Sequence, residues 1–397
     1  MSPTASPSIP APPSGQAVTP APILWADPAR EVAFQAWLAA TATAHGLDAG
    51  IVRAASADAS FRRYFRVDRA DGTGHRIIMD APPDKENCQP FVQVAGLLQA
   101  AGLRVPEILA WDEPQGFMLL SDLGAQTMLD VLDRDRPQAN LGLYQQAVDI
   151  LVDWQRASRP GVLPAYDEAL LQRELALFPE WYVQRHRGIT LDDQQQATLQ
   201  ATFQTLVAHN LAAPSVYVHR DFMPRNLMVS YAAPTLPAAR GSLPPEGVRS
   251  ALGRPGGGTD VRLGVLDFQD AVYGPITYDI ASLMRDAFLS WEEDFVLDIT
   301  VRYWQAARKA GLPVQEDFGD FYRAVEWMGL QRHLKVAGIF ARITLRDGKP
   351  KYLADTPRFI HYIRTTASRY RELTPLLRLV DQIEGTTPQV GFAYGRV

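Results

Sequence analysis

The chain has few of the residues that would specify a disulfide framework, a membrane anchor or a polyanion-binding surface. Its 397 residues include one cysteine, Cys88, which excludes an internal disulfide and a zinc site built on several cysteines. No run of about 18 apolar residues occurs, so we expect no transmembrane helix. Lys and Arg number 39 against 44 for Asp and Glu, a balance that lacks the basic excess typical of nucleic-acid-binding proteins.

The start of the chain also lacks the basic residues and the apolar stretch of a secretory signal. Residues 1–22 are instead rich in Pro, Ala and Ser, so we predict a disordered tail and a cytoplasmic protein. The whole chain is 47% hydrophobic and 21% charged, a composition that can bury a sizeable core. Its length allows two or three structural units.

The first part of the chain predicts a small antiparallel sheet crossed by one helix. The strand signals cover residues 61–67, 76–79, 108–111 and 117–120. The crossing helix is expected over 91–101 and ends at Gly102, and an earlier helix is expected over 22–50.

From residue 127 onward the pattern turns helical. Helices are predicted over 128–132, 143–154, 169–184, 191–210, 280–308, 318–345 and 358–379. Short strands are expected over 216–218, 227–231 and 261–267, and the last two are expected to pair as a hairpin. Residues 232–260, between them, are rich in Pro, Gly and Ala, which favours a flexible insertion. The fold class predicted is therefore α+β.

Two motifs carry the chemistry. Residues 218–227 read VHRDFMPRNL, and residues 265–270 read VLDFQD on the expected partner strand. Phosphoryl transfer from a nucleotide needs a carboxylate near the attacking hydroxyl and oxygen ligands for magnesium. We predict Asp221 as the base that orients and deprotonates the hydroxyl. Asn226 and Asp267 are predicted to hold magnesium, because hard cations prefer oxygen ligands.

These paired motifs resemble the aminoglycoside phosphotransferase-like branch of the protein-kinase fold, and the resemblance covers about 51–379. Five longer sequence motifs make the resemblance more specific and point to one subfamily. They read SADASFRRYFRV over 56–67, MDAPP over 79–83, LLSDLG over 119–124, LFPEWY over 177–182 and LQRHLKV over 330–336. They are similar to the anomeric sugar kinases that phosphorylate N-acetylmuramate and N-acetylglucosamine at the 1-hydroxyl in bacterial cell-wall recycling.

The resemblance implies a bilobal fold. A β-rich lobe over 23–123 would bind nucleotide, and a larger, mostly helical lobe over 124–397 would carry the catalytic and sugar-binding residues. ATP and Mg2+ would be required, and the products would be the α-1-phosphate and ADP. The implied partners are the sugar and the nucleotide, with no nucleic acid, no membrane and no obligate protein partner.

The sequence departs from the kinase pattern where nucleotide phosphates are usually bound. Ordinary kinases carry a Lys on the third strand, paired with a Glu on the crossing helix. The Lys position falls here at Met79 or Asp80, and 91–101 contains no Glu or Asp. No G-x-G-x-x-G occurs, so Ser60 is expected to donate to phosphate. Arg63 and Lys85 are candidates to replace the Lys, and a role as solvated surface charges stays open.

The segment 119–123 is expected to be the hinge between lobes, where the backbone at Asp122 and Leu123 would read the adenine edge. A second interpretation of the missing Lys–Glu pair is a nucleotide-binding pseudokinase. The presence of Asp221, Asn226 and Asp267 argues against it.

The sugar-binding residues implied by the resemblance are Glu180, Trp181, His333 and Arg342. Trp181 would stack on a pyranose face, and a basic residue would meet the lactyl carboxylate of N-acetylmuramate. A packing or surface role for each stays open. An aminoglycoside or a choline-like compound is the alternative acceptor. Against an aminoglycoside, which is a polycation, the C-terminal helices offer few clustered acidic residues, and the main run is 292–294.

Two further residues are expected to support the catalytic loop. His219 would pack under the loop as a hydrogen-bonded scaffold residue. Asp279 resembles the helix-start Asp that accepts backbone N–H groups of the loop, and a plain N-cap is the alternative.

Overall fold

The computed structural model describes residues 23–57, 61–231 and 261–386. The predicted tail over 1–22, Ser60 and the predicted insertion over 232–260 lie outside the described residues. The chain divides into two compact units. Unit 1 contains the chain up to Cys88 together with Glu107–Asp122, and unit 2 contains Gln89–Pro106 and the chain from Leu123 onward.

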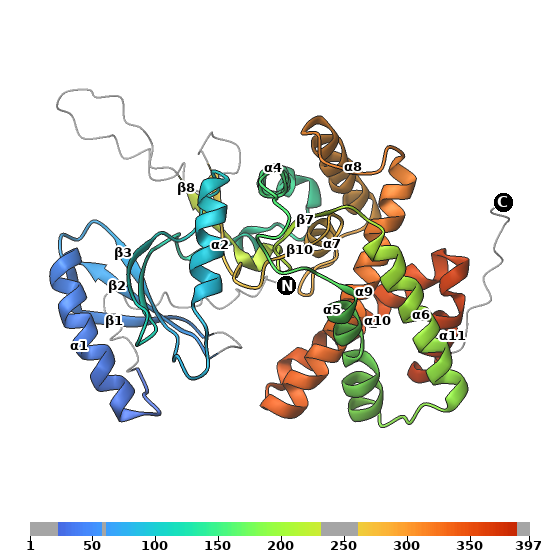
Figure 1. Cartoon of the computed structure of the whole chain (residues 1–397), viewed down its shortest axis with the longest axis horizontal. Coiled ribbons are helices and arrows are strands. Elements are labelled where there is room, and N and C mark those ends of the chain that lie inside the picture. The colour runs from blue at the N-terminus through green and yellow to red at the C-terminus, as the bar shows by residue number, and fades with distance from the viewer. Residues whose placement is uncertain (1–22, 58–60, 232–260, 387–397) are drawn as a thin grey trace, which may run out of the picture. The chain divides into compact units, whose positions relative to one another are not determined.

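Unit 1 is an antiparallel sheet with one helix against it (Figure 1). The strand order is β1-β2-β3-β5-β4. The strands are β1 (Leu47–Ala57), β2 (Arg63–Arg69), β3 (His75–Asp80), β4 (Ile108–Asp112) and β5 (Phe117–Ser121), and the helix is α1 (Pro28–His45).

The buried face of α1 is aromatic, and it packs on the sheet through ring contacts. Phe34 lies 5.2 Å from Phe65 and 5.7 Å from Phe117, centroid to centroid, and Trp37 lies 5.4 Å from Phe117. Aromatic side chains bury large areas, so these contacts fix α1 against β2 and β5.

The predicted helix over 22–50 is too long, because Gly46 ends it in the left-handed conformation at φ 61°. Leu47–Ala57 then form a strand that the sequence analysis missed. β1 is the edge strand, and its register against β2 shifts between Asp48 and Val52 and again between Ala54 and Ser56. Such irregularities interrupt the alternation of apolar and polar residues by which a strand is recognised.

Helix α2 (Gln89–Ala100), which the sequence analysis grouped with the sheet, belongs to unit 2. Phe91 on α2 lies 4.8 Å from the ring of Phe268. The segment after α2 is also tied to this unit, since the carbonyl of Arg104 accepts the N–H of Val265 at 2.8 Å.

Two short sheets in unit 2 hold the motif loops. β7 (Ser215–Val218) pairs with β10 (Val272–Pro275), and β8 (Leu227–Tyr231) pairs with β6 (Gln126–Thr127) and β9 (Val261–Val265). The predicted hairpin is confirmed, with Leu227 opposite Val265. The loop 219–226 therefore joins β7 to β8, and the loop 266–271 joins β9 to β10, so each loop connects the two sheets.

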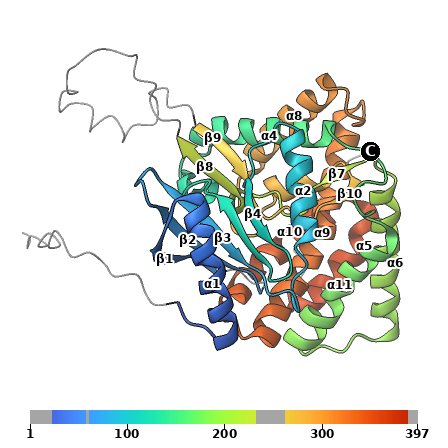
Figure 2. The same ribbon diagram turned by 60° about the vertical axis from the view of Figure 1, so that its left-hand side comes forward.

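Helices make up most of unit 2 (Figures 1 and 2). They are α3 (Met128–Val131), α4 (Leu141–Arg156), α5 (Glu168–Leu175), the π-helix Phe178–His186, α6 (Asp193–Leu211), α7 (Tyr278–Met284), α8 (Glu293–Lys309), α9 (Phe318–Asp347), α10 (Thr356–Arg369) and α11 (Thr374–Glu384), with 3-10 turns Pro137–Asn140, Pro224–Asn226, Pro350–Asp355 and Arg371–Leu373. Among the described helices, none has the length and apolar character needed to cross a membrane.

Three helices predicted as continuous are interrupted. The prediction over 169–184 is wrong at 176–177, since α5 ends at Leu175 and the π-helix starts at Phe178 with a proline in its first turn. The prediction over 280–308 is wrong at 285–292, where the side chain of Asp286 accepts the N–H of Phe288 at 3.1 Å and so competes with helical hydrogen bonding. The prediction over 358–379 is wrong at Tyr370, which is extended at φ −118° and ψ 124°. A new helix starts after it with a proline in its first turn.

Helix α9 contacts α5, α6, α7, α8, α10 and the π-helix, so it is the central helix of unit 2. Its approach to the start of the π-helix depends on Gly338. A Cβ added at Gly338 would lie 2.4 Å from the backbone carbon and oxygen of Leu177. Only glycine therefore allows the two helices to approach so closely.

We expect Gly338→Ala to lower the free energy of unfolding by about 1–3 kcal/mol, because the added methyl group overpacks this contact. Gly329→Ala in the same helix is the matched control. Its Cβ would meet the nearest atom, on His333, at an ordinary 3.7 Å, so it should be neutral or stabilising by about 0.5–1 kcal/mol. Urea unfolding of both variants gives the measurement. Equal stability of Gly338→Ala and the wild type would contradict the packing argument.

Candidate active site

The catalytic loop is anchored at its start by a buried carboxylate. Asp279, near the start of α7, accepts the N–H of His219 at 2.7 Å and that of Arg220 at 3.0 Å. The N-cap position of α7 is Thr277, so Asp279 is not a plain N-cap of its own helix. Arg220 has φ 76°, a strained conformation for a non-glycine residue. Burial raises the pKa of Asp279 to about 6, against the opposing effect of His219 and the two N–H groups.

His219 connects the two motif loops. It is buried, its Nε2 lies 3.0 Å from the carbonyl oxygen of Leu266, and its Nδ1 accepts the N–H of Asp221 at 3.2 Å. These partners assign the ring proton to Nε2. Burial lowers the pKa of His219, which favours this neutral form. Both ring nitrogens of His219 therefore contact backbone atoms of the two motif loops.

Asn226 brings the motif residues together. Its amide nitrogen donates to the backbone oxygen of Asp221 at 2.9 Å and to the carboxylate of Asp267 at 3.2 Å. The backbone carbonyl of Asn226 accepts the N–H of Leu266 at 2.9 Å. Asp267 also accepts from the side chain of Gln269 at 2.9 Å, and its backbone is left-handed at φ 62°. Asn226 thus contacts both the backbone of Asp221 and the carboxylate of Asp267.

The donor set suits magnesium. Asp267 supplies a carboxylate, and because the nitrogen of Asn226 is used for donation, its amide oxygen is the atom that can bind a cation. Among the described residues, no group of three or more His, Cys, Asp or Glu side chains could hold a metal ion. A magnesium ion at these two residues would therefore take further ligands from water or phosphate, as Mg2+ commonly does.

Behind the loop lie charged residues that the sequence analysis missed. Glu174 on α5 and Lys335 on α9 form an ion pair of 2.9 Å, and Glu174 also pairs with Arg220 at 2.5 Å. Arg332 on α9 is buried as well. The available signal was the spacing of Arg332 and Lys335, since residues three apart share one face of a helix.

Arg63, one of the predicted nucleotide residues in unit 1, forms an ion pair within that unit. Arg63 donates to Asp80 at 3.0 Å and to the carbonyl of Leu24 at 3.2 Å, and its guanidinium lies 3.9 Å from the ring of Trp25. Asp80 is fully buried and also accepts from Arg30 at 2.9 Å. The position that carries a Lys in ordinary kinases is Met79 or Asp80 here. It is therefore next to, or is itself, a carboxylate that is paired with two arginines.

The other predicted nucleotide residues also have protein contacts. Lys85 is exposed, with its Nζ 5.1 Å from the ring of Phe61. Asp122 accepts from Arg66 at 2.7 and 3.2 Å. Leu123 is buried against Gly264, where an added Cβ would come within 2.9 Å of its side chain. Nucleotide binding by these residues stays a prediction.

The predicted sugar residues lie on two elements that pack together at Gly338. Glu180 and Trp181, on the π-helix, both contact Arg185, through an ion pair of 3.1 Å and a ring contact of 3.9 Å. π-Helical segments are often found at functional sites.

The other two predicted sugar residues are on α9. His333 is buried, its ring stacks 4.6 Å from that of Tyr362, and its Nε2 lies 3.3 Å from the carbonyl of Arg285. Burial, with help from Arg332, lowers the pKa of His333 to about 3, so its ring is neutral. Arg342 is half-buried, and its Nε has no hydrogen-bond partner among the described residues.

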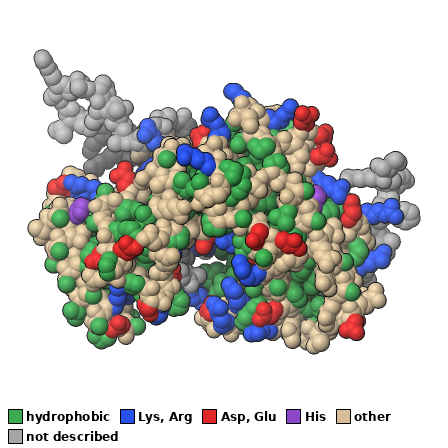
Figure 3. All heavy atoms as spheres, in the orientation of Figure 1, with side chains coloured by type: hydrophobic (Ala, Val, Ile, Leu, Met, Phe, Trp, Pro, Cys, Tyr) green, Lys and Arg blue, Asp and Glu red, His purple; other side chains and the backbone are tan. Residues whose placement is uncertain are grey.

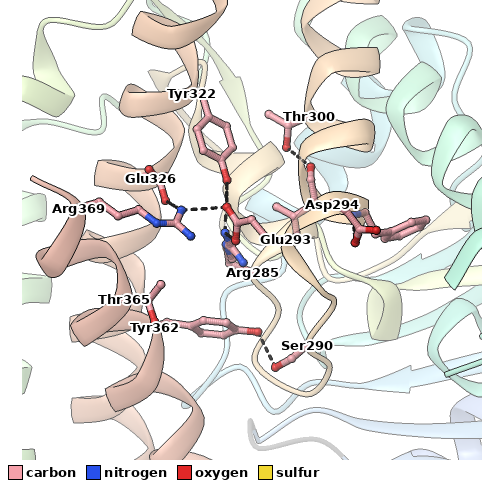
Figure 4. Close-up of polar contacts among 12 residues, drawn as sticks. Arg285, Ser290, Glu293, Asp294, Thr300, Tyr322, Glu326, Tyr362, Thr365 and Arg369 are labelled. Atoms are coloured by element: carbon pink, nitrogen blue, oxygen red, sulfur yellow. Dashed lines mark hydrogen bonds and ion pairs between the residues drawn. The ribbon is translucent and has the colours of Figure 1, made fainter. Parts of the chain in front are cut away.

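The acidic run 292–294 is partly neutralised by the protein itself (Figure 4). Glu293 accepts from Arg285 at 2.7 Å, from Arg369 at 2.8 Å and from the hydroxyl of Tyr322. Burial opposes ionisation, but these hydrogen bonds outweigh it and lower the pKa of Glu293 to about 2. Glu293 is therefore committed to a structural network. Elsewhere, the face drawn in Figure 3 carries acidic and basic side chains interspersed.

The fold is similar to that of solved small-molecule kinases. The choline kinase LicA from Streptococcus pneumoniae superposes with a TM-score of 0.54 at 13% identity, covering 85% of this chain and 99% of that one. An ethanolamine kinase from Plasmodium vivax superposes with a TM-score of 0.52 at 12% identity, covering 84% of each chain. The predicted α+β, aminoglycoside phosphotransferase-like fold is confirmed.

The sequence comparisons extend this similarity to family level. The model of the phosphotransferase enzyme family (APH) matches residues 51–236 and 258–314. An N-acetylmuramate/N-acetylglucosamine kinase from Pseudomonas putida is 49% identical, and the match covers 85% of this chain and 89% of that relative. A protein of the same name from Neisseria meningitidis is 45% identical, with 92% of this chain and 99% of the relative covered. The chain therefore belongs to the phosphotransferase enzyme family.

Proposed function

We propose that this protein is an ATP-dependent kinase that phosphorylates the anomeric 1-hydroxyl of N-acetylmuramate and N-acetylglucosamine. The observation that carries the substrate is the identity of 49% and 45%, over most of the chain, to relatives named as kinases of these two sugars. The contact of Asn226 with both Asp221 and Asp267 supports the chemistry. Such a kinase needs ATP, so we place it in the cytoplasm, in the recycling of peptidoglycan.

In this proposal Asp221 orients the sugar hydroxyl toward the γ-phosphorus of ATP. The bond from the sugar oxygen to phosphorus forms while the bond from phosphorus to the β-phosphate oxygen breaks, and ADP leaves. The hydroxyl proton passes to the carboxylate of Asp221 and then to solvent. An anomeric hydroxyl is more acidic than an ordinary alcohol, so Asp221 acts chiefly by positioning, in line with a loose transition state.

Asn226 and Asp267 would hold magnesium in this proposal. When bound, the ion supplies positive charge that neutralises the phosphates of the nucleotide. Asp279 and His219 hold the loop backbone, so Asp221 keeps one orientation in the absence of substrate. A preformed arrangement of this kind lowers the cost of reaching the transition state.

For the sugar, we propose contacts with the π-helix and α9. Trp181 is half-buried, and Arg185 lies over its ring, so a pyranose would stack on the other ring face or replace Arg185. The neutral ring of His333 suits an uncharged sugar hydroxyl or amide better than a carboxylate. Arg342, with its unpartnered Nε, is the better candidate for the lactyl carboxylate of N-acetylmuramate.

A coupled ADP-release assay with N-acetylmuramate, N-acetylglucosamine, choline and kanamycin tests the function. We expect magnesium-dependent turnover on the two sugars, with the phosphate on the 1-hydroxyl by 31P NMR. Turnover on choline or kanamycin alone would contradict the sugar assignment and keep the kinase. Nucleotide binding without turnover on any of the four would favour the pseudokinase interpretation.

A further inference from the structure

A buried ion-pair network contacts the catalytic loop through Arg220. Glu174 is its centre. One carboxylate oxygen accepts Arg220 at 2.5 Å and Lys335 at 2.9 Å, and the other accepts the hydroxyl of Tyr166. The side chains of Glu174 and Lys335 are only 6% and 12% exposed, so this network is largely shielded from water.

The network continues along α9 through Tyr278. Lys335 donates to the hydroxyl of Tyr278 at 3.2 Å, and the guanidinium of Arg332 lies 5.2 Å from the Tyr278 ring. The charge of Asp221 acts on Arg220, Arg332 and Lys335 and contributes to raising the pKa of each. The proposed base is therefore within electrostatic reach of three buried cations.

Around Glu174, two cations face two anions. The cations are Arg220 and Lys335, and the charges of Glu174 and Asp221 act on both of them. A buried charge is tolerated when it is paired, and removal of one partner leaves another charge uncompensated in a poorly solvated place. Loss of Glu174 would leave Arg220 and Lys335, two cations, against the single anion Asp221. The excess positive charge would then attract the carboxylate of Asp221.

We propose that Glu174 is a positioning residue for catalysis, which fixes the direction of the Asp221 side chain by holding Arg220 and by balancing the buried charge of Lys335. Two anchors from different helices act on Arg220. Asp279 holds its backbone N–H, and Glu174 holds its guanidinium. Because Arg220 directly precedes Asp221 and has a strained backbone, the two anchors together determine where the next residue points. The inference rests on the proposed kinase function.

Steady-state kinetics of Glu174→Gln tests this inference, with ATP and whichever hydroxyl compound the wild type phosphorylates. We expect kcat to fall about 10- to 100-fold, because small displacements of a reacting group have effects of this size. The KM values for both substrates should change less than about threefold. Glu168→Gln, an exposed residue on the same helix, is the matched control and should match the wild type.

The double variant Glu174→Gln/Lys335→Met restores the local balance, with the cation Arg220 against the anion Asp221. We expect the kcat of the double variant to be at least about tenfold higher than that of Glu174→Gln. A role of Glu174 in stability alone would not produce this increase. Thermal unfolding accompanies each assay. A Glu174→Gln variant with wild-type kcat, or a double variant no faster than the single, would overturn the inference. A wild type inactive on all the acceptors would instead contradict the proposed function.

Discussion

Asp221→Asn should lower kcat about a thousandfold and leave the affinity for ATP unchanged. The amide can neither orient the hydroxyl as a carboxylate does nor accept its proton, and such a group contributes about 10²- to 10⁴-fold. The two hydrogen bonds that seat this residue use its backbone N–H and carbonyl, so the substitution leaves the loop in place. The coupled ADP-release assay gives kcat, and calorimetry gives the dissociation constant of ATP.

Asp270→Asn serves as the control, since Asp270 is exposed in the neighbouring motif loop. It should retain wild-type kcat. A kcat within tenfold of the wild type for Asp221→Asn would remove Asp221 from the role of base. A parallel loss of ATP affinity would place its carboxylate in the nucleotide site instead.

Asp267→Asn should also lower kcat about a thousandfold, and the magnesium concentration for half-maximal rate should rise at least about tenfold. Asp267 is the one carboxylate in the proposed metal pair, and metal charge contributes several kcal/mol to such transition states. The substitution also places an amide donor against the amide groups of Asn226 and Gln269, which both donate to Asp267. Rates are measured as a function of magnesium concentration, and chelation with EDTA should stop the wild type.

The same Asp270→Asn variant controls for a general effect of charge in this segment. It should keep the magnesium dependence of the wild type. If Asp267→Asn showed wild-type magnesium dependence, the metal site would have to lie elsewhere. Thermal unfolding distinguishes loss of the metal site from loss of the fold.

Local sequence signals predicted most elements of both units. The hairpin of β8 and β9 follows from two short apolar strands, and its register brings Asn226 and Asp267 together. The edge strand β1 was missed because its irregular register breaks the alternation on which strand prediction depends. The break at 285–292 was missed because one side chain, Asp286, interrupts a helix that propensity alone would continue.

The sequence by itself determined the family and predicted the three motif residues, because the chemistry needs particular residue types at short, fixed spacings. It did not show that Arg63 pairs with Asp80, nor that Glu174 forms ion pairs with both Arg220 and Lys335. Arg63 and Asp80 meet because the register of β2 against β3 places them opposite each other. Glu174 and Lys335 are far apart in the chain, and only the packing of α5 and α9 brings them into contact. Burial then decides their role, since the same charges on the surface would be solvated and contribute little.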